Sequence, residues 1–226
     1  MKIAEKLFLG LPLPFSKWIY NISRQIIYKD IRNPGFRKAV ALIRDMGVKG
    51  DYLEFGVYKG TSLITFYNLF KASGLSEIRL FAFDAFRGLP NDEGKVFQKG
   101  EFFFPKQSFV KRIRKSGVEP EKVVIVEGYF NVSLTDRVKK DNNLNKAAII
   151  HVDCDLYEST VDVLKFCREL VQDGTVLIFD DYLSFQTETD PTQYGEEKAF
   201  KAWELYPLFE EIYEIGVSKA FVCKFK

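Results

Sequence analysis

The sequence predicts an α/β fold in which helices cover both faces of a mostly parallel, seven-stranded sheet. Five short apolar runs alternate with segments of helical periodicity, which is the pattern of strands buried on both faces. The last two strands are joined by a short link that permits an antiparallel pair, whereas parallel neighbours need a long crossover. A chain of 226 residues suits one such domain, or at most two small ones.

The composition is that of an ordinary globular protein. Hydrophobic residues make up 46% and charged residues 28% of the chain, which is ample material for a core. A formal net charge of only +2 gives no reason to expect a nucleic-acid partner. The three cysteines contain no CxxC pair, so the sequence suggests neither a disulfide framework nor a zinc site. We therefore expect a cytoplasmic location.

Residues 1–32 form an N-terminal arm ahead of the domain. Its apolar stretch, residues 7–15, is interrupted by Gly10, Pro12 and Pro14 and is followed by no cleavage pattern of a signal peptide. It is also too short to cross a bilayer. We expect the arm to pack on the domain, on a partner subunit or at the substrate mouth, with peripheral membrane contact as the alternative. Because an apolar arm is costly to expose, we expect a homodimer.

The domain proper, residues 33–226, shows no internal boundary. Asn33 and Pro34 are typical of a helix start, and that helix is expected to end at Gly47. Apolar runs predict strands at 51–56, 79–84, 122–126, 147–153, 175–180, 210–215 and 220–226. Helical periodicity predicts helices at 61–72, about 107–116, 131–140, 157–171 and 195–205.

One segment, residues 85–106, has no regular periodicity and is rich in glycine, proline and phenylalanine. A loop of this length inside a compact domain is usually a lid or a binding loop. We expect it to close over a site and exclude water.

A glycine turn, EFGVYKGTS at residues 54–62, follows the first strand. Gly56 and Gly60 permit a sharp turn and a close approach to a ligand, and the helix that follows offers unpaired N–H groups to an anionic group. Asp84, at the end of the second strand, is placed to accept hydrogen bonds from a ribose diol. Sharp turns also need glycine for purely structural reasons, but the turn and Asp84 together favour a nucleoside cofactor.

The spacing of the glycines limits which cofactors the turn could bind. It fits neither GxGxxG nor GxxxxGK[ST], the patterns that bind a pyrophosphate or a triphosphate. The looser E-x-G-x-x-x-G form suits a cofactor with a carboxylate and an amine, and S-adenosylmethionine meets that description.

Three acids stand at the ends of two later strands: Asp153, Asp180 and Asp181. Since parallel strands end at the same edge of a sheet, these carboxylates should converge, and they would repel one another without a cation. Oxygen ligands of this kind select Mg²⁺ or a similar divalent ion. The alternative is that Asp181 turns the chain into the next loop and Asp155 only opens the next helix.

His151 is the only histidine of the chain, and strand alternation places it on the same side as Asp153. It could act as a base near neutral pH. A histidine within a strand is more often a hydrogen-bonded structural residue, and both interpretations stay open.

Several stretches, taken in order, resemble the macrocin (TylF-like) O-methyltransferases. They are LEFGVYKGTS, FAFDAFRGLP, IIHVDCDLYEST and GTVLIFDDY, followed by the helix start GEEKA, and the resemblance covers roughly residues 33–226. It implies a Rossmann-like methyltransferase fold. It also implies S-adenosylmethionine- and Mg²⁺-dependent O-methylation of a sugar hydroxyl, or a similar vicinal diol, in a natural-product or polysaccharide glycoside.

By position, the resemblance implies roles for the residues of the glycine turn. Gly56, Tyr58 and Ser62 would contact the methionine part of the cofactor, Glu54 would support its amino-acid end, and Asp84 would hold the ribose. Gly128 and Tyr129, which follow the third strand, would flank the adenine.

For the acidic residues, the resemblance implies that Asp153, Asp180 and Asp181 are the metal ligands. Asp155 matches the position proposed for the general base in one branch of the family. Leu156 stands where the related catechol O-methyltransferases use a lysine base.

Two other functions are compatible with acids at strand ends. A phosphoryl or nucleotidyl transferase would use the metal, but the chain lacks a phosphate-cradling lysine loop. A non-catalytic cofactor-binding protein would keep the fold, but such a protein would be expected to have lost some of these acids.

Overall fold

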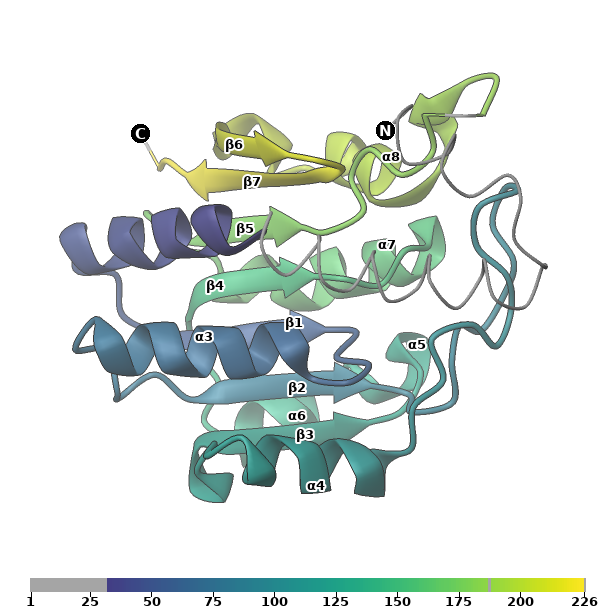
Figure 1. Cartoon of the computed structure of the whole chain (residues 1–226). Coiled ribbons are helices and arrows are strands. Elements are labelled where there is room, and N and C mark those ends of the chain that lie inside the picture. The colour runs from purple at the N-terminus through teal and green to yellow at the C-terminus, as the bar shows by residue number, and fades with distance from the viewer. Residues whose placement is uncertain (1–31, 187, 226) are drawn as a thin grey trace, which may run out of the picture.

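The computed structural model describes residues 32–186 and 188–225. Except for Arg32, which is already helical, the expected N-terminal arm lies outside the described residues. Within them, one seven-stranded sheet has the order β3-β2-β1-β4-β5-β7-β6 (Figure 1). Strands β1 to β5 pair in parallel, and β7 pairs antiparallel with both β5 and β6. The predicted fold class is confirmed.

The strands fall close to the predicted ranges. They are β1 (Asp51–Phe55), β2 (Leu80–Asp84), β3 (Val123–Glu127), β4 (Ala147–Val152), β5 (Val176–Phe179), β6 (Phe209–Ile215) and β7 (Ser218–Cys223). The helices are residues 32–45, α3 (Thr61–Ala72), α4 (Lys106–Lys115), α5 (Phe130–Ser133), α6 (Asp136–Asp141), α7 (Tyr157–Cys167) and α8 (Gly195–Ala202).

Two helical layers sandwich the sheet, as Figure 1 shows. The helix at 32–45, α3 and α4 cover one face, and α5 to α8 cover the other. Successive residues of β1 face opposite layers, so that Tyr52 packs in the first core and Leu53 in the second. Both are fully buried, because a parallel sheet has no solvent face.

Three predicted helices differ from the structure. The range 131–140 is two helices, because Thr135 caps α6 by accepting a hydrogen bond from the Val138 N–H. The range 157–171 is α-helical only to Cys167 and continues as a 3₁₀ turn, Arg168–Leu170. The range 195–205 ends at Ala202, since Trp203 is extended.

The strand order reverses between β1 and β4, which are neighbours although three strand-to-strand connections separate them in the chain. A crevice outside the carboxyl ends of the strands forms at such a switch point, and ligands bind there in open α/β sheets. The glycine turn follows β1, and the predicted metal ligands follow β4 and β5. No helix among the described residues is long and apolar enough to cross a membrane.

Candidate active site

The predicted acids gather at the carboxyl ends of β4 and β5. Asp153 belongs to two groups of ligand atoms, each with all members within 4.8 Å of one another. One group joins it to His151 and Asp180, and the other joins it to Asp155 and Asp181. The structure therefore places Asp153 beside each of the other two predicted ligands and each predicted base, in two groups that share Asp153.

Asp180 lies almost completely buried between a cation and a histidine. Its Oδ2 accepts a hydrogen bond from Arg32 Nη1, and the same nitrogen lies 3.8 Å from Asp153 Oδ2. Its other oxygen, Oδ1, lies 3.6 Å from His151 Nε2. Burial lowers the pKa of His151 well below its ordinary value, so the imidazole is neutral.

Asp181 and Asp155 belong to the second group of the cluster. Their carboxyl groups are hydrogen-bonded to each other, and burial, followed by the charge of Asp181, raises the pKa of Asp155 well above its ordinary value. Asp155 has a left-handed backbone, with φ +65°. Such a conformation costs a non-glycine residue on the order of 1–3 kcal/mol and is concentrated at functional sites.

Glu196, at the start of α8, is a further buried acid of this cluster. Its Oε2 accepts a hydrogen bond from the Asp181 N–H at 2.9 Å. Burial, followed by the charge of Asp181, raises the pKa of Glu196 well above its ordinary value. Glu196 thereby fixes the turn that carries Asp181.

This donor set suits a divalent cation. Carboxylate oxygens converge there, and burial, followed by the charge of Asp181, raises the pKa values of Asp155 and Glu196. The guanidinium of Arg32 already contacts two of the acids, so the site attracts positive charge.

The glycines of the β1–α3 turn are required by packing against the protein. A Cβ at Gly56 would lie 1.8 Å from the Asp153 carbonyl oxygen, and the residue has φ +89°. A Cβ at Gly60 would lie 2.7 Å from the Phe109 ring of α4. Gly56 thus brings the glycine turn directly against the backbone of the first predicted metal ligand.

Glu54 lies beneath this turn and is fully buried. It accepts hydrogen bonds from the hydroxyl groups of Ser62 and Tyr52, and the Tyr52 oxygen lies 3.0 Å from His151 Nδ1. Burial raises the pKa of Glu54 to about 8. A hydrogen-bonded chain therefore runs through the core from Ser62, after the glycine turn, to His151.

Asp84 ties the turn to the end of β2. Its Oδ2 accepts from the backbone N–H groups of Val57 and Tyr58, at 2.9 and 3.1 Å, and its Oδ1 accepts from the Phe86 N–H at 2.6 Å. A carboxylate offers about four lone-pair directions, so one remains for a ligand. Gly128 and Tyr129 lie half-buried after β3, the strand next to β2.

Glu93, in the 85–106 loop, connects the loop to both acid-bearing segments. Its carboxylate accepts from the Tyr157 N–H at the start of α7 and from the Gly195 N–H at the start of α8, each at 2.6 Å. Helix α7 begins four residues after Asp153, and α8 is the next α-helix along the chain after Asp181. A small apolar cluster reinforces the contact and consists of Leu89, Phe97, Leu156 and Phe185.

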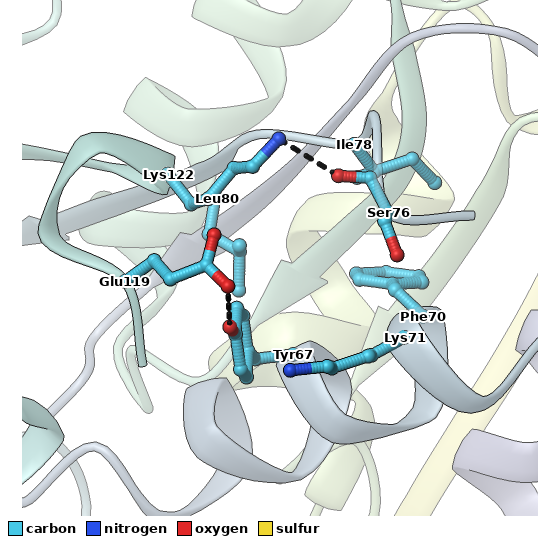
Figure 2. Close-up of a pocket in the computed structure, with 8 residues that line it drawn as sticks. All are labelled: Tyr67, Phe70, Lys71, Ser76, Ile78, Leu80, Glu119 and Lys122. Atoms are coloured by element: carbon cyan, nitrogen blue, oxygen red, sulfur yellow. Dashed lines mark hydrogen bonds between the residues drawn. The ribbon is translucent and has the colours of Figure 1, made fainter. Parts of the chain in front are cut away.

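A separate hollow lies by the amino ends of β2 and β3, away from the acids (Figure 2). At its rim, Lys122 Nζ donates a hydrogen bond to the Ser76 carbonyl, and the Tyr67 hydroxyl donates one to Glu119, as Figure 2 shows. The hollow has a volume of about 40 Å³, far below the roughly 300–1,000 Å³ of ligand pockets. We assign it no function.

Four residues of the site were missed from the sequence: Arg32, Tyr52, Glu93 and Glu196. Tyr52 and Glu54 are two apart on one strand, a spacing that signals a shared face. Glu196 stands in the GEEKA stretch quoted for the resemblance, where it was given no role. Arg32 contacts Asp180, more than a hundred positions away in the sequence, and Glu93 contacts the Tyr157 N–H, more than sixty positions away. No local sequence pattern predicts such distant pairs.

Known proteins share sequence features and the fold with this chain. A sequence model of the family described as macrocin-O-methyltransferase (TylF) matches residues 28–202. A Streptomyces olivaceus protein, 8-demethyl-8-(2,3-dimethoxy-alpha-L-rhamnosyl)-tetracenomycin-C 4'-O-methyltransferase, is 29% identical over 60% of this chain and 54% of its own length. The Streptomyces niveus demethyldecarbamoylnovobiocin O-methyltransferase is 26% identical over 74% of this chain and 64% of its own length. The chain thus spans between half and two thirds of these relatives.

Solved structures show the same fold. The O-methyltransferase NovP has a TM-score of 0.71 at 21% identity, covering 86% of this chain and 80% of its own. The calicheamicin methyltransferase CalS11 has a TM-score of 0.68 at 23% identity, covering 98% and 90%.

Proposed function

This chain belongs to the macrocin O-methyltransferase (TylF) family, and on that premise we propose that it is an S-adenosylmethionine-dependent O-methyltransferase. The proposed acceptor is a hydroxyl group of a sugar, or of a similar vicinal diol, in a natural-product or polysaccharide glycoside. The observation that carries the proposal is the contact of the glycine turn with the acid cluster, through Gly56 and Asp153, at the switch point of the sheet.

S-adenosylmethionine, when bound, supplies a methyl group activated on a sulfonium sulfur. The start of α3 has no side-chain cap, so its first N–H groups are available to the carboxylate of this cofactor. Gly56, Tyr58 and Gly60 shape this turn, and Glu54 and Ser62 hold it from beneath. We assign the ribose to the remaining acceptor site of Asp84, and the adenine to the neighbourhood of Gly128 and Tyr129.

We assign a divalent cation, Mg²⁺ or a similar ion, to Asp153, Asp180 and Asp181. Such a cation, when bound, lowers the pKa of a hydroxyl group and orients its oxygen. Glu196 holds the backbone of Asp181, and the residues from Asp153 to Tyr157 form a short connection fastened by Glu93. These contacts pre-organise the acids before any ligand arrives.

Asp155 is the proposed general base for the acceptor hydroxyl. It lies next to Asp181 in the cluster, and its strained backbone turns its carboxyl group toward the acids. His151 is fully buried behind Asp180, so we assign the proton transfer to Asp155 and a different role to His151.

The 85–106 loop is the proposed lid. Glu93 and the apolar cluster around Phe97 and Phe185 hold it against the segments that carry the acids. In this position it would exclude water from the transfer. Phe103 on the lid is 56% exposed and is available to the acceptor.

Calorimetry tests the proposal against its alternatives. The protein should bind S-adenosylmethionine, whereas binding of ATP with Mg²⁺ and not of S-adenosylmethionine would favour phosphoryl or nucleotidyl transfer. A panel of rhamnosyl glycosides and nucleotide-linked sugars, each incubated with cofactor and cation, should then yield a product heavier by one methyl group. Cofactor binding with no product from any acceptor would favour a non-catalytic protein.

A further inference from the structure

His151 presents one ring nitrogen to a hydroxyl group and the other to a carboxylate. Its Nδ1 lies 3.0 Å from the Tyr52 oxygen, and its Nε2 lies 3.6 Å from Asp180 Oδ1. Among the described residues, both His151 Nε2 and Asp180 Oδ1 are buried without a hydrogen-bond partner. Two buried polar atoms without partners are unusual and call for a physical cause.

The hydrogen bond from Tyr52 to Glu54 determines which nitrogen of His151 donates to Tyr52. Tyr52 has one hydroxyl proton, which it donates to Glu54 Oε2 at 2.6 Å. The phenol oxygen is then an acceptor, so Nδ1 of the neutral ring must be the N–H donor. This direction holds when Glu54 is ionised, and also when its proton lies on Oε1, the oxygen paired with Ser62. In this arrangement Nε2 carries a lone pair.

The lone pair of Nε2 faces a lone pair of Asp180 in a site shielded from water. Two such acceptors repel each other at 3.6 Å unless a cation lies between them. Ligand atoms on one ion stand about 3–3.5 Å apart when metal–ligand bonds are about 2.0–2.2 Å, so the observed separation needs little adjustment. Asp153 completes the group, with all three ligand atoms within 4.8 Å.

We propose that His151 Nε2 is a nitrogen ligand of the cation held by Asp153 and Asp180, and that it shifts the preference of the site from Mg²⁺ toward Mn²⁺. Imidazole suits transition metals, whereas Mg²⁺ prefers an all-oxygen shell. The proposal rests on the metal dependence in the proposed function and adds a ligand to it. Tyr52 and Glu54 act as positioning residues, since they set the tautomer.

Two substitutions separate ligation from packing. His151 also packs against the rings of Phe36 and Phe66, with centroids 5.4 and 5.8 Å away, so any replacement removes some contacts. His151→Asn keeps a donor near Nδ1 and removes Nε2. His151→Gln instead places an amide near Nε2 and offers an oxygen ligand. A ligand role predicts that Asn lowers the Mn²⁺-to-Mg²⁺ affinity ratio at least tenfold, and that Gln restores Mg²⁺ binding more than Mn²⁺ binding.

The closing experiment uses the wild-type chain, in which His151 is the only histidine. Protein labelled with ¹⁵N-histidine and purified without a histidine tag should show an unprotonated Nε2 by NMR. With Mn²⁺ bound, pulsed electron paramagnetic resonance should detect a directly coordinated nitrogen, lost in His151→Asn. A protonated Nε2, or bound Mn²⁺ without nitrogen coupling, overturns the proposal and leaves the methyltransferase intact. Failure of wild-type protein to bind Mn²⁺ overturns the metal site as well, while S-adenosylmethionine binding is measured separately.

Discussion

Arg32 and Asp180 form an ion pair across 148 positions of the chain, with Nη1 of the guanidinium against Oδ2 of the carboxylate. The two side chains are only 16% and 5% exposed, so water screens the pair weakly. The same guanidinium is also close to Asp153. The protein's own cation thus contacts two of the three acids that we assign to a metal.

Arg32→Ala should therefore tighten the binding of Mg²⁺ and Mn²⁺ by about tenfold, or ~1.4 kcal/mol, because a fixed positive charge no longer opposes the ion. Titration calorimetry measures this affinity. Arg37→Ala is the matched control, since Arg37 is exposed on the same helix, and should leave the affinity unchanged. Weaker cation binding in Arg32→Ala would show that Arg32 supports the ion rather than competing with it.

Glu93→Ala should loosen the lid and both helix starts, because two backbone N–H groups lose a charged acceptor. The expected loss of unfolding free energy is about 2–4 kcal/mol. Hydrogen exchange should increase in residues 85–106 and at the start of α7. Glu101→Ala is the control within the same loop, since Glu101 accepts a local bond from the Gln98 N–H. Equal hydrogen exchange in the two variants would contradict the role of Glu93 as a latch, that is, as the residue that fastens the loop to the starts of α7 and α8.

Glu54 should make the protein less stable as the pH rises. Its pKa is about 8 in the folded chain, above the ordinary value of 4.5, because burial favours the neutral form. Between these values the unfolded chain has lost this proton and the folded chain retains it, so the free energy of unfolding falls by about 1.4 kcal/mol per pH unit. Glu54→Gln removes this term. Denaturant unfolding at pH 5, 6, 7 and 8 should show that the free energy of unfolding of the variant rises relative to that of the wild type as the pH increases. A difference that does not change with pH would refute the raised pKa of Glu54.

Gly56→Ala should cost about 3 kcal/mol or more of unfolding free energy, because the new Cβ would collide with the Asp153 carbonyl oxygen. The same displacement should weaken cation binding. Gly117→Ala provides the comparison: it has a similar positive φ, +81°, but nothing within 4 Å of its Cβ, so it should cost about 1 kcal/mol. Similar losses of unfolding free energy in both variants would show that backbone strain, and not the contact with Asp153, explains why position 56 needs glycine.

The elements were largely predictable, because each strand is a short apolar run and α3 has a clear helical period. Thr61–Ala72 was predicted to the residue. The acids could be placed together because the carboxyl ends of parallel strands share an edge. The helix at 131–140 was misjudged, since its apolar period continues across the Thr135 cap that divides it.

The contacts that organise the site could not be predicted in the same way. The Glu54–Tyr52–His151 chain depends on the register of β1 against β4, in which Glu54 pairs with His151. The latch at Glu93 depends on how an irregular loop folds back over two helix starts. Neither the strand register nor the path of a loop leaves a periodic signal, so a single sequence indicates the acids at the strand ends but not the contacts that hold them.

We propose that the acid cluster serves metal-dependent methyl transfer and that S-adenosylmethionine binds independently of the metal. The most direct test compares wild-type protein and Asp180→Asn, measuring cofactor affinity by calorimetry and methyl transfer to a sugar acceptor by mass spectrometry. We predict that Asp180→Asn binds the cofactor nearly as tightly as the wild type but transfers no methyl group, and that excess chelator stops the wild type equally. Unchanged methylation in Asp180→Asn, or in the presence of chelator, would contradict the account.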